Sequence, residues 1–317
     1  MKIVVTEPTH MAEPVRAALN ELGAVVYGPF DDSALARELA DCEVLVVRLG
    51  RHIGAETFGR APHLRFLVTA TTGLDHIDLA AAKARGVRVI SLRDCPDAIR
   101  DVSATAELTW GLLLALTRGI PAATAHTLAG DWNRDLFFSE QLHGKRLGIV
   151  GYGRIGAMVA RYGLAFGMEV LAHDTDANKI APPAIRATLD EIARTCDAIS
   201  IHVTAIPENR HLIDGAFLAQ VRPQAVLINT ARGSAVDEAA LAEAIASRRI
   251  AGAAVDVLQG EEHRLTASSP LLAAARAGGN VLITPHIGGC TLDALAQAEG
   301  AVVRLLKAES AVKAHGQ

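Results

Sequence analysis

The sequence predicts an α/β protein of two lobes, each built on a parallel β-sheet with helices on both faces, and a cleft between the lobes. Two observations support this prediction. Short runs rich in β-branched residues alternate with segments whose apolar residues recur at helical spacing. These runs are continuously apolar, which is typical of parallel strands buried on both faces. The length of 317 residues favours about two domains.

The expected strands fall into two sets along the chain. The first set comprises Lys2–Thr6, Ala24–Tyr27, Val44–Arg48, Phe66–Ala70 and Arg88–Ser91. The second set comprises Arg146–Val150, Glu169–His173, Ala198–Val203, Ala225–Asn229, Gly252–Asp256 and Val281–Thr284. Between the sets, apolar residues at helical spacing predict a long buried helix over Val102–Gly119, which we take as the hinge. A last helix, from Thr291 to about Lys313, is expected to return to the first lobe. We therefore predict a discontinuous domain of residues 1–100 plus 290–317 and a second domain of residues 101–289.

Composition narrows the class of protein. The formal net charge of −4 leaves no basic face of the kind that binds nucleic acid. Apolar runs such as Leu112–Leu116 are far shorter than the roughly 20 residues needed to span a bilayer, and the N-terminus shows no signal-peptide core. The four cysteines form no Cys-x-x-Cys pair, so we expect neither a disulfide framework nor a metal site. We predict a cytoplasmic protein that binds neither membranes nor nucleic acid.

A glycine-rich turn is the strongest sign of a cofactor. Gly151-Tyr-Gly153-Arg154-Ile155-Gly156 follows the expected strand Arg146–Val150 and precedes a helical run, as a dinucleotide-binding Rossmann turn requires. The pattern alone is weak, because glycines at such a turn can reflect only tight packing of strand and helix. Asp174 ends the next strand, where a carboxylate accepts hydrogen bonds from the ribose hydroxyls and repels a 2′-phosphate. We therefore expect NAD in preference to NADP, although Asp174 could also be a simple turn residue.

Three residues downstream of this turn have the chemistry for hydride transfer to a carbonyl beside a carboxylate. Arg232 supplies a cation that holds the carboxylate and polarises the carbonyl, and His286 supplies a proton donor near neutral pH. Glu261 supplies a negative charge that favours the protonated ring. Arg232 and His286 each follow the carboxyl end of an expected strand, where ligands bind in parallel sheets. Spacing from Asp256 selects Glu261 over the adjacent Glu262.

Five motifs, in one order along the chain, give a close resemblance to a known family. They are Thr72-Gly73-Leu-Asp75-His-Ile-Asp78-Leu, Ala106-Glu107-Leu-Thr-Trp, Gly144-Lys145-Arg-Leu-Gly-Ile-Val-Gly151, Asn229-Thr-Ala-Arg232-Gly233 with Val236-Asp237-Glu238, and Thr284-Pro285-His286. In these motifs the chain resembles the NAD-dependent D-isomer-specific 2-hydroxyacid dehydrogenases, which include phosphoglycerate, D-lactate, glyoxylate and hydroxypyruvate enzymes. The resemblance covers nearly the whole length, so it implies an enzyme that interconverts a 2-keto acid and a D-2-hydroxy acid.

The resemblance also implies residue roles. Arg232 would bind the substrate carboxylate and carbonyl, His286 would be the acid/base, and Glu261 would pair with His286. Asp256 would lie near the nicotinamide carboxamide, and the backbone of residues 71–74 in the other lobe would hold the substrate carboxylate. Further expected cofactor contacts are Thr72, Val203, Thr230, Ala231, Gly288 and Gly289. The expected substrate contacts are Arg48, Thr71, Thr72, Gly73 and Arg232. Residues 1–100 plus 290–317 would then be the substrate domain and residues 101–289 the NAD-binding domain.

Departures from the family pattern leave the substrate open. Arg48 stands where enzymes for phosphorylated substrates carry a cation, but Thr69 replaces an arginine often found in them and Thr71 replaces a common glycine. The apolar helix Val102–Gly119 and the segment through Trp132 carry more apolar surface than one lobe needs, which predicts a homodimer. Arg134 would then either reach the neighbouring subunit's site or be a solvated loop residue. Two alternative functions are a non-catalytic NAD-sensing regulator on the same fold and a relative that oxidises a phosphonate or phosphite.

Overall fold

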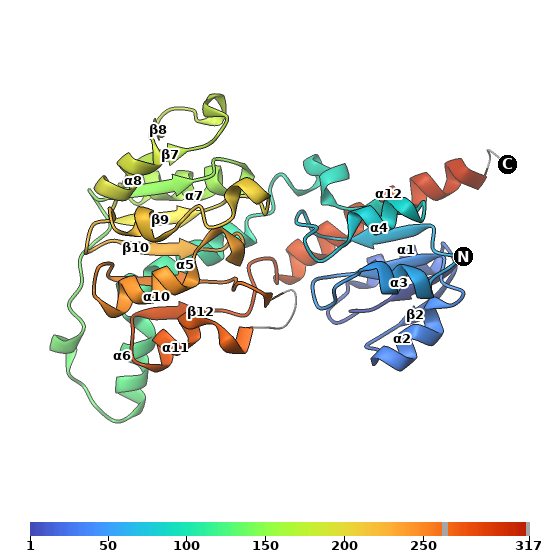
Figure 1. Cartoon of the computed structure of the whole chain (residues 1–317), viewed down its shortest axis with the longest axis horizontal. Helices are drawn as coiled ribbons and strands as arrows, with labels where there is room; N and C mark the ends of the chain where they lie inside the picture. Colours follow the sequence, from blue (N-terminus) through green and yellow to red (C-terminus); the bar gives the residue numbers. More distant parts are fainter. Residues whose placement is uncertain (262–265, 315–317) are drawn as a thin grey trace. The chain divides into compact units, whose positions relative to one another are not determined.

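The computed structural model describes residues 1–261 and 266–314. The chain divides into two compact units, which we call unit 1 (Met1–Val102 with Cys290–Gln317) and unit 2 (Ser103–Gly289) (Figure 1). Each unit contains one fully parallel sheet, of five strands in unit 1 and seven in unit 2. The predicted α/β class with two parallel sheets is therefore confirmed. In the described part of the chain, no helix combines the length and the apolar character needed to cross a membrane.

Unit 1 is a sheet with helices on both faces. Its strands are β1 (Lys2–Val5), β2 (Ala24–Tyr27), β3 (Val44–Val47), β4 (Phe66–Thr69) and β5 (Arg88–Ile90), in the order β2-β1-β3-β4-β5. Its helices are α1 (Glu13–Asn20), α2 (Asp32–Leu39), α3 (Ala55–Arg60), α4 (Leu79–Ala84) and α12 (Leu292–Ala314), with the short 3₁₀ turns η1 (Leu92–Asp94) and η2 (Pro96–Ile99). Side chains alternate between the faces: Ile3 and Val5 pack with α1 and α12, whereas Val4 packs with α2, α3 and α4.

The last helix, α12, belongs to unit 1. Val302 and Leu306 of α12 are fully buried in the core of this unit. The helix packs on α1 and β4, and two of its carboxylates reach the sheet. Glu299 pairs with Arg48 at the end of β3, and Glu309 pairs with Arg88 at the start of β5. The first and last parts of the chain thus share one core.

Unit 2 has the strand order of a dinucleotide-binding sheet. Its strands are β6 (Arg146–Val150), β7 (Glu169–His173), β8 (Ile185–Arg186), β9 (Ala198–Ile201), β10 (Val226–Asn229), β11 (Gly252–Val255) and β12 (Val281–Ile283), in the order β12-β11-β10-β9-β6-β7-β8. The order reverses between β6 and β9, and ligands bind parallel sheets at the carboxyl ends of the strands beside such a reversal. The glycine-rich turn after β6 lies at this point.

The helices of unit 2 cover both faces of its sheet (Figure 1). They are α5 (Ala104–Thr117), α6 (Ile120–Leu128), α7 (Arg154–Ala165), α8 (Leu189–Thr195), α9 (Gly215–Leu218), α10 (Glu238–Ala246) and α11 (Pro270–Arg276). The 3₁₀ turns are η3 (Arg134–Leu136), η4 (Ala177–Lys179), η5 (Pro207–Asn209), η6 (Gly233–Ala235) and η8 (Thr266–Ser268). Helices α5 and α7 pack on one face, where the Trp110 and Phe166 rings stack with centroids 4.5 Å apart. Helices α8 to α11 pack on the other.

The helix expected over Val102–Gly119 is shorter than the sequence pattern indicates. Helix α5 ends at Thr117, because Gly119 adopts a left-handed conformation with φ of 60° that terminates a helix. Helix α6 then starts at Ile120, with a proline in its first turn, where the missing N–H is not needed. Helix α5 buries one face, whereas no residue of α6 is buried. The apolar character of α6 is therefore not explained by the core of its own unit.

Candidate functional site

The glycine-rich turn between β6 and α7 has the geometry of a phosphate-binding loop. Gly151 has a φ of 95°, and a Cβ on Gly156 would lie 2.0 Å from the Gly151 carbonyl oxygen, so both positions require glycine. A Cβ on Gly153 would meet no described atom within 4 Å, which leaves open space at the N-terminus of α7. Gly153 occupies the N-cap position of this helix, and no side chain there accepts a hydrogen bond from the first amides of the helix. An anion such as a pyrophosphate fits this position.

Asp174 follows β7 and faces the same turn. Its Oδ2 accepts a hydrogen bond from the Tyr152 amide at 2.8 Å, and its Oδ1 accepts one from the Asp176 amide at 2.9 Å. The Lys179 ammonium lies 3.4 Å from Oδ1. Burial raises the pKa of this carboxyl, but the two amide hydrogen bonds and the Lys179 charge outweigh burial, so the net pKa is lowered. A negative charge therefore stands beside the glycine-rich turn at neutral pH.

Arg232 is held in a tight turn after β10. The Asn229 side chain accepts from the Ala231 amide at 3.0 Å and donates to the Arg232 carbonyl at 2.9 Å, which fixes the backbone of the turn. A Cβ on Gly233 would lie 2.2 Å from the Leu258 carbonyl carbon, so glycine is needed for the turn to approach the segment after β11. The Arg232 backbone is thus adjacent to the segment that contains Glu261.

His286 lies in a strained loop after β12. Its φ of 54° is uncommon for a residue with a side chain. The buried Asp256 carboxylate fixes this loop, because it accepts hydrogen bonds from the Thr284 hydroxyl at 2.6 Å and from the Ile287 and Gly288 amides at 2.8 and 2.7 Å. The His286 amide itself donates to the Asp256 carbonyl at 2.8 Å. Four hydrogen bonds therefore hold His286 in a conformation that it would not favour alone.

Glu261 and His286 form a direct pair. The distance between His286 Nδ1 and Glu261 Oε1 is 2.7 Å, and the two side chains are 27% and 22% exposed. The other carboxylate oxygen of Glu261 accepts from the Leu258 amide at 3.2 Å. The carboxylate therefore engages the Nδ1 side of the ring, which fixes the orientation of the imidazole. Glu262, the alternative partner, lies outside the described residues.

The remaining cofactor candidates surround the ends of β9 and β10. The Thr230 hydroxyl lies 2.8 Å from the Thr109 hydroxyl of α5, and the Thr105 hydroxyl donates to the Gly288 carbonyl at 3.1 Å. His202 precedes Val203 and lies 2.8 Å from the Ser200 hydroxyl through Nε2. Desolvation lowers the pKa of His202 to about 3, so this ring is neutral at physiological pH and is not a second proton donor.

Four of the five expected substrate residues, Arg48, Thr71, Thr72 and Gly73, lie in unit 1. The loop Thr71–Gly73 follows β4, and the Thr71 hydroxyl donates to the Gly73 carbonyl at 2.7 Å. Arg48 is already engaged within this unit: its Nε lies 2.8 Å from Glu299 Oε1, and a terminal nitrogen donates to the Thr9 carbonyl at 2.7 Å. Anion binding by Arg48 would have to compete with both contacts.

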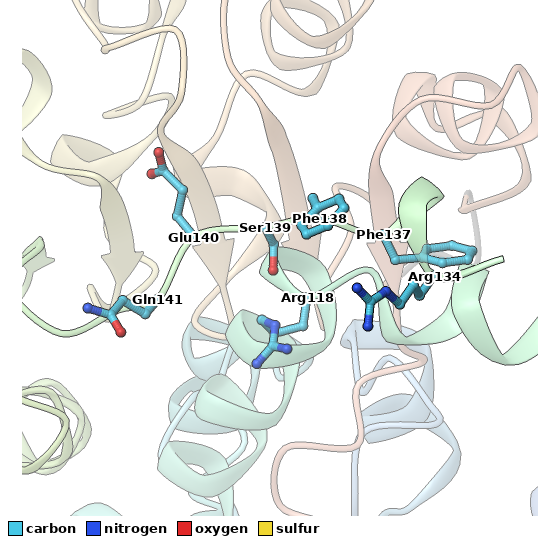
Figure 2. A pocket seen from close by; sticks show the side chains of 7 residues that line it. All are labelled: Arg118, Arg134, Phe137, Phe138, Ser139, Glu140 and Gln141. Carbon is cyan, nitrogen blue, oxygen red and sulfur yellow. The ribbon is translucent and has the colours of Figure 1, made fainter.

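A hollow of about 490 Å³ lies in unit 2 away from these residues. Its lining residues, shown in Figure 2, are Arg118, Arg134, Phe137, Phe138, Ser139, Glu140 and Gln141. Arg134 is 91% exposed and lies 3.8 Å from Asp135. None of the lining residues is one of the predicted catalytic or cofactor-binding residues, so this hollow is a separate feature of the segment that follows α6.

Some residues that shape the site carry no strong signal in the sequence. Asn229 was considered only as part of a motif, although an asparagine at the end of a strand often folds its side chain back onto the following turn. Thr105 and Thr109 were read as part of an apolar helix. Their contacts with Gly288 and Thr230 join residues more than a hundred positions apart, and no local pattern indicates such pairs.

Comparison with known proteins gives one consistent result. Residues 110–288 match the family model described as D-isomer specific 2-hydroxyacid dehydrogenase, NAD binding domain. A D-3-phosphoglycerate dehydrogenase of Methanocaldococcus jannaschii is 36% identical over 308 residues, which cover 96% of this chain and 56% of the relative. A hydroxypyruvate reductase of Thermotoga maritima is 34% identical over 260 residues, which cover 82% of this chain and 82% of the relative. The chain thus spans little more than half the length of the phosphoglycerate dehydrogenase it matches.

Solved structures give the same result for the fold. The D-lactate dehydrogenase of Aquifex aeolicus, complexed with NAD and lactic acid, has a TM-score of 0.84 and 28% identity, covering 99% of this chain and 97% of its own. A formate dehydrogenase of Staphylococcus aureus, in complex with NAD, has a TM-score of 0.83 and 27% identity, covering 97% of this chain and 95% of its own. Both are similar over both units of the chain.

Proposed function

Because this chain belongs to the D-isomer-specific 2-hydroxyacid dehydrogenase family, whose NAD-binding domain it carries, we propose that it interconverts a 2-keto acid and a D-2-hydroxy acid with NAD. The observation that supports this most strongly is the 2.7 Å contact between His286 Nδ1 and Glu261 Oε1. A carboxylate on one ring nitrogen stabilises the protonated ring and fixes its orientation. Such a ring can donate a proton from Nε2 to an oxygen that gains negative charge.

The proposed residue roles follow from charge and position. Bound NADH supplies the hydride for C2 of the keto acid. Arg232 pairs with the substrate carboxylate and polarises the carbonyl, because a guanidinium donates two parallel hydrogen bonds. His286 gives its proton to the carbonyl oxygen as the alkoxide develops, and the Glu261 carboxylate holds the ring in place through Nδ1. In oxidation the same residues act in reverse.

The cofactor is proposed to lie along the carboxyl edge of the unit 2 sheet. Its pyrophosphate would lie at the glycine-rich turn, and the adenosine ribose would be bound by Asp174. The D-lactate dehydrogenase and the formate dehydrogenase of similar fold were both solved with NAD. Val203, Thr230, Ala231, Asp256, Gly288 and Gly289 stay candidates for the remaining contacts. Unit 2 would thus be the NAD-binding domain.

The substrate class is proposed as a 2-keto acid, with Arg232 of unit 2 as a ligand of its carboxylate. In unit 1, which would be the substrate domain, the backbone of Thr71–Gly73 is a candidate ligand for a carboxylate. The similar proteins named above include enzymes for phosphoglycerate, hydroxypyruvate and lactate, which differ in the group attached to C2. The role of Arg48 as a ligand for a charged substrate group stays a prediction. Such a group would compete with Glu299 for the Arg48 guanidinium. Whether the substrate is phosphorylated is therefore a question for substrate comparison.

A homodimer is part of the proposal. Leu128, Trp132 and Phe138 are 83%, 88% and 80% exposed, and they lie on α6 and the long loop after it (Figure 1). Large apolar side chains exposed together mark an interaction surface, and symmetric dimers are the commonest oligomers. The expected mass is about 67 kDa, twice the chain mass of 33.3 kDa. Arg134, at the hollow of Figure 2, could then face the second subunit. A cytoplasmic location is part of the same proposal.

One experiment separates the proposed function from its alternatives. NADH absorbance is followed with a panel of 2-keto acids that includes glyoxylate, pyruvate, hydroxypyruvate and a phosphorylated member, and NAD⁺ reduction is followed with phosphite. Oxidation of NADH with a keto acid supports the dehydrogenase. NAD⁺ reduction by phosphite alone would support the phosphite-oxidising relative. NADH binding without turnover of any compound would favour the non-catalytic regulator.

A further inference from the structure

In unit 1, the loop Thr71–Gly73 is tied to the turn η1 through two consecutive carbonyl groups. The Leu92 amide donates to the Thr71 carbonyl at 3.2 Å, and Arg93 Nε donates to the Thr72 carbonyl at 2.6 Å. Leu92 and Arg93 are neighbours in η1, so both donors come from one short element. The second bond is made by a cationic side chain and is therefore the stronger type.

These two bonds decide where the amides of the loop point. A trans peptide unit is planar, and its N–H points opposite to its carbonyl. The Thr71 carbonyl shares a peptide unit with the Thr72 amide, and the Thr72 carbonyl shares one with the Gly73 amide. Both amides therefore face away from η1. Within residues 1–261 and 266–314, neither amide donates to any group.

The element that holds the loop is itself firmly anchored. Leu92 is buried in the core of unit 1 at 6% exposure. Ser91 and Asp94 form a reciprocal capping box around η1, and Asp94 also pairs with Arg88 at 2.8 Å. The Leu92 amide is therefore a fixed donor, and the exposed Arg93 side chain extends from a fixed backbone.

Arg93 also differs from the other cations near this end of the sheet. Arg48 pairs with Glu299, and Arg51 pairs with Asp32. In the described part of the chain, Arg93 forms no ion pair with a carboxylate, and its side chain donates to the neutral Thr72 carbonyl. Its positive charge is therefore not cancelled by an adjacent carboxylate, and it adds to the positive potential at the loop.

From this geometry we infer that Arg93 is a positioning residue for substrate binding: it holds the peptide units of Thr71–Gly73 so that the Thr72 and Gly73 amides face the substrate carboxylate. The inference rests on the proposed function, because the carboxylate is that of the 2-keto acid. Arg93 acts through the Thr72 carbonyl and not by contact with the substrate. Loss of Arg93 allows the peptide unit to rotate, which weakens carboxylate binding without removing any reacting group.

The test compares Arg93→Met and Arg93→Lys with Arg100→Met, all in the full chain. Arg100 is an exposed arginine of the same segment whose pair is Asp97, so it is a matched control. For Arg93→Met we expect KM for a 2-keto acid to rise about tenfold, the size of one lost charge-assisted hydrogen bond. We expect kcat to change by less than about twofold, because the reacting groups are intact, and KM for NADH to stay constant. Arg93→Lys keeps a cationic donor and should recover part of the loss.

Oxamate, an unreactive analogue with the same carboxylate, gives a readout that does not need turnover. The affinity of oxamate for the complex of enzyme and NADH, measured by calorimetry, should fall about tenfold in Arg93→Met and stay unchanged in Arg100→Met. Unchanged oxamate affinity in Arg93→Met would overturn the inference even if the wild type reduces keto acids. A wild type that reduces no keto acid would instead contradict the proposed function, whatever oxamate shows.

A comparison of keto acids with and without a second acidic group distinguishes a positioning role of Arg93 from direct contact with the substrate. If Arg93 positions the loop, KM rises by a similar factor for glyoxylate and for a keto acid with a second acidic group. If the loss is confined to the substrate with the second acidic group, Arg93 binds that group directly and the positioning role is wrong. The melting temperature of each variant checks that replacement of the exposed side chain does not alter the fold.

Discussion

Replacement of Glu261 by glutamine should slow keto acid reduction without changing the shape of the site. Glutamine keeps an oxygen that can accept from His286 Nδ1, so the ring stays in the same orientation, but the negative charge is lost. The contact is 2.7 Å long and both side chains are mostly withdrawn from solvent, so screening by water is incomplete. A hydrogen bond between charged groups contributes about 1.5 kcal/mol more than a neutral one. Because about 1.4 kcal/mol corresponds to a factor of ten, we expect kcat for reduction to fall about tenfold.

The assay is NADH consumption at saturating keto acid, with Glu261→Gln, Glu261→Ala and Glu262→Gln compared with the wild type. The alanine variant also loses the orientation of the ring and the contact to the Leu258 amide, so its loss should be larger, about a hundredfold. Glu262→Gln is the matched control, because it removes the same charge one residue along. Activity of Glu261→Gln within twofold of the wild type, or a larger loss in Glu262→Gln, would refute the assigned pairing.

Three further outcomes are expected. His286→Ala should lower turnover by about 10²-fold or more, as loss of an acid/base group does, with little change in NADH affinity by fluorescence titration; near-normal turnover would remove His286 from this role. Asp174→Ala should weaken NADH binding and narrow the preference for NADH over NADPH, because the lowered pKa of Asp174 leaves its carboxylate charged at neutral pH, where it repels a 2′-phosphate; equal use of both cofactors by the wild type would contradict this role. Alkylation near neutral pH followed by mass spectrometry should modify the exposed Cys290 but not Cys42 or Cys196, because burial raises the pKa of both thiols to about 12; labelling of all three at one rate would show that the two cores open readily.

The parts of the site that the sequence could predict are those that depend on local spacing. The glycine-rich turn is one continuous segment between a strand and a helix, and its glycines are needed for reasons that act within six residues. Arg232 and His286 follow strand ends, and the carboxyl ends of parallel strands share one edge of a sheet. The spacing that favoured Glu261 over Glu262 was of the same kind, and Glu261 is the residue that contacts His286 in the structure.

The parts that the sequence could not predict depend on pairs that are far apart along the chain. Arg48 was expected to be a cation available to a substrate, but Glu299, some 250 residues later, lies against its guanidinium. Such a pair depends on how α12 packs on the unit 1 sheet, and this packing is set by many apolar contacts at once. The same is true of Arg93, whose position beside Thr72 depends on how β4 and β5 align.

Asp256 shows how one carboxylate can be needed by both the loop and the cofactor. The family resemblance implies that Asp256 contacts the nicotinamide carboxamide. A carboxylate has about four acceptor positions, and the Thr284 hydroxyl and the Ile287 and Gly288 amides use three of them. The side chain is also only 1% exposed. In this conformation Asp256 therefore acts on His286 through the loop backbone, and about one acceptor position is left for a contact with the cofactor. Any effect of an Asp256 substitution on hydride transfer must then include the loss of the strained His286 conformation.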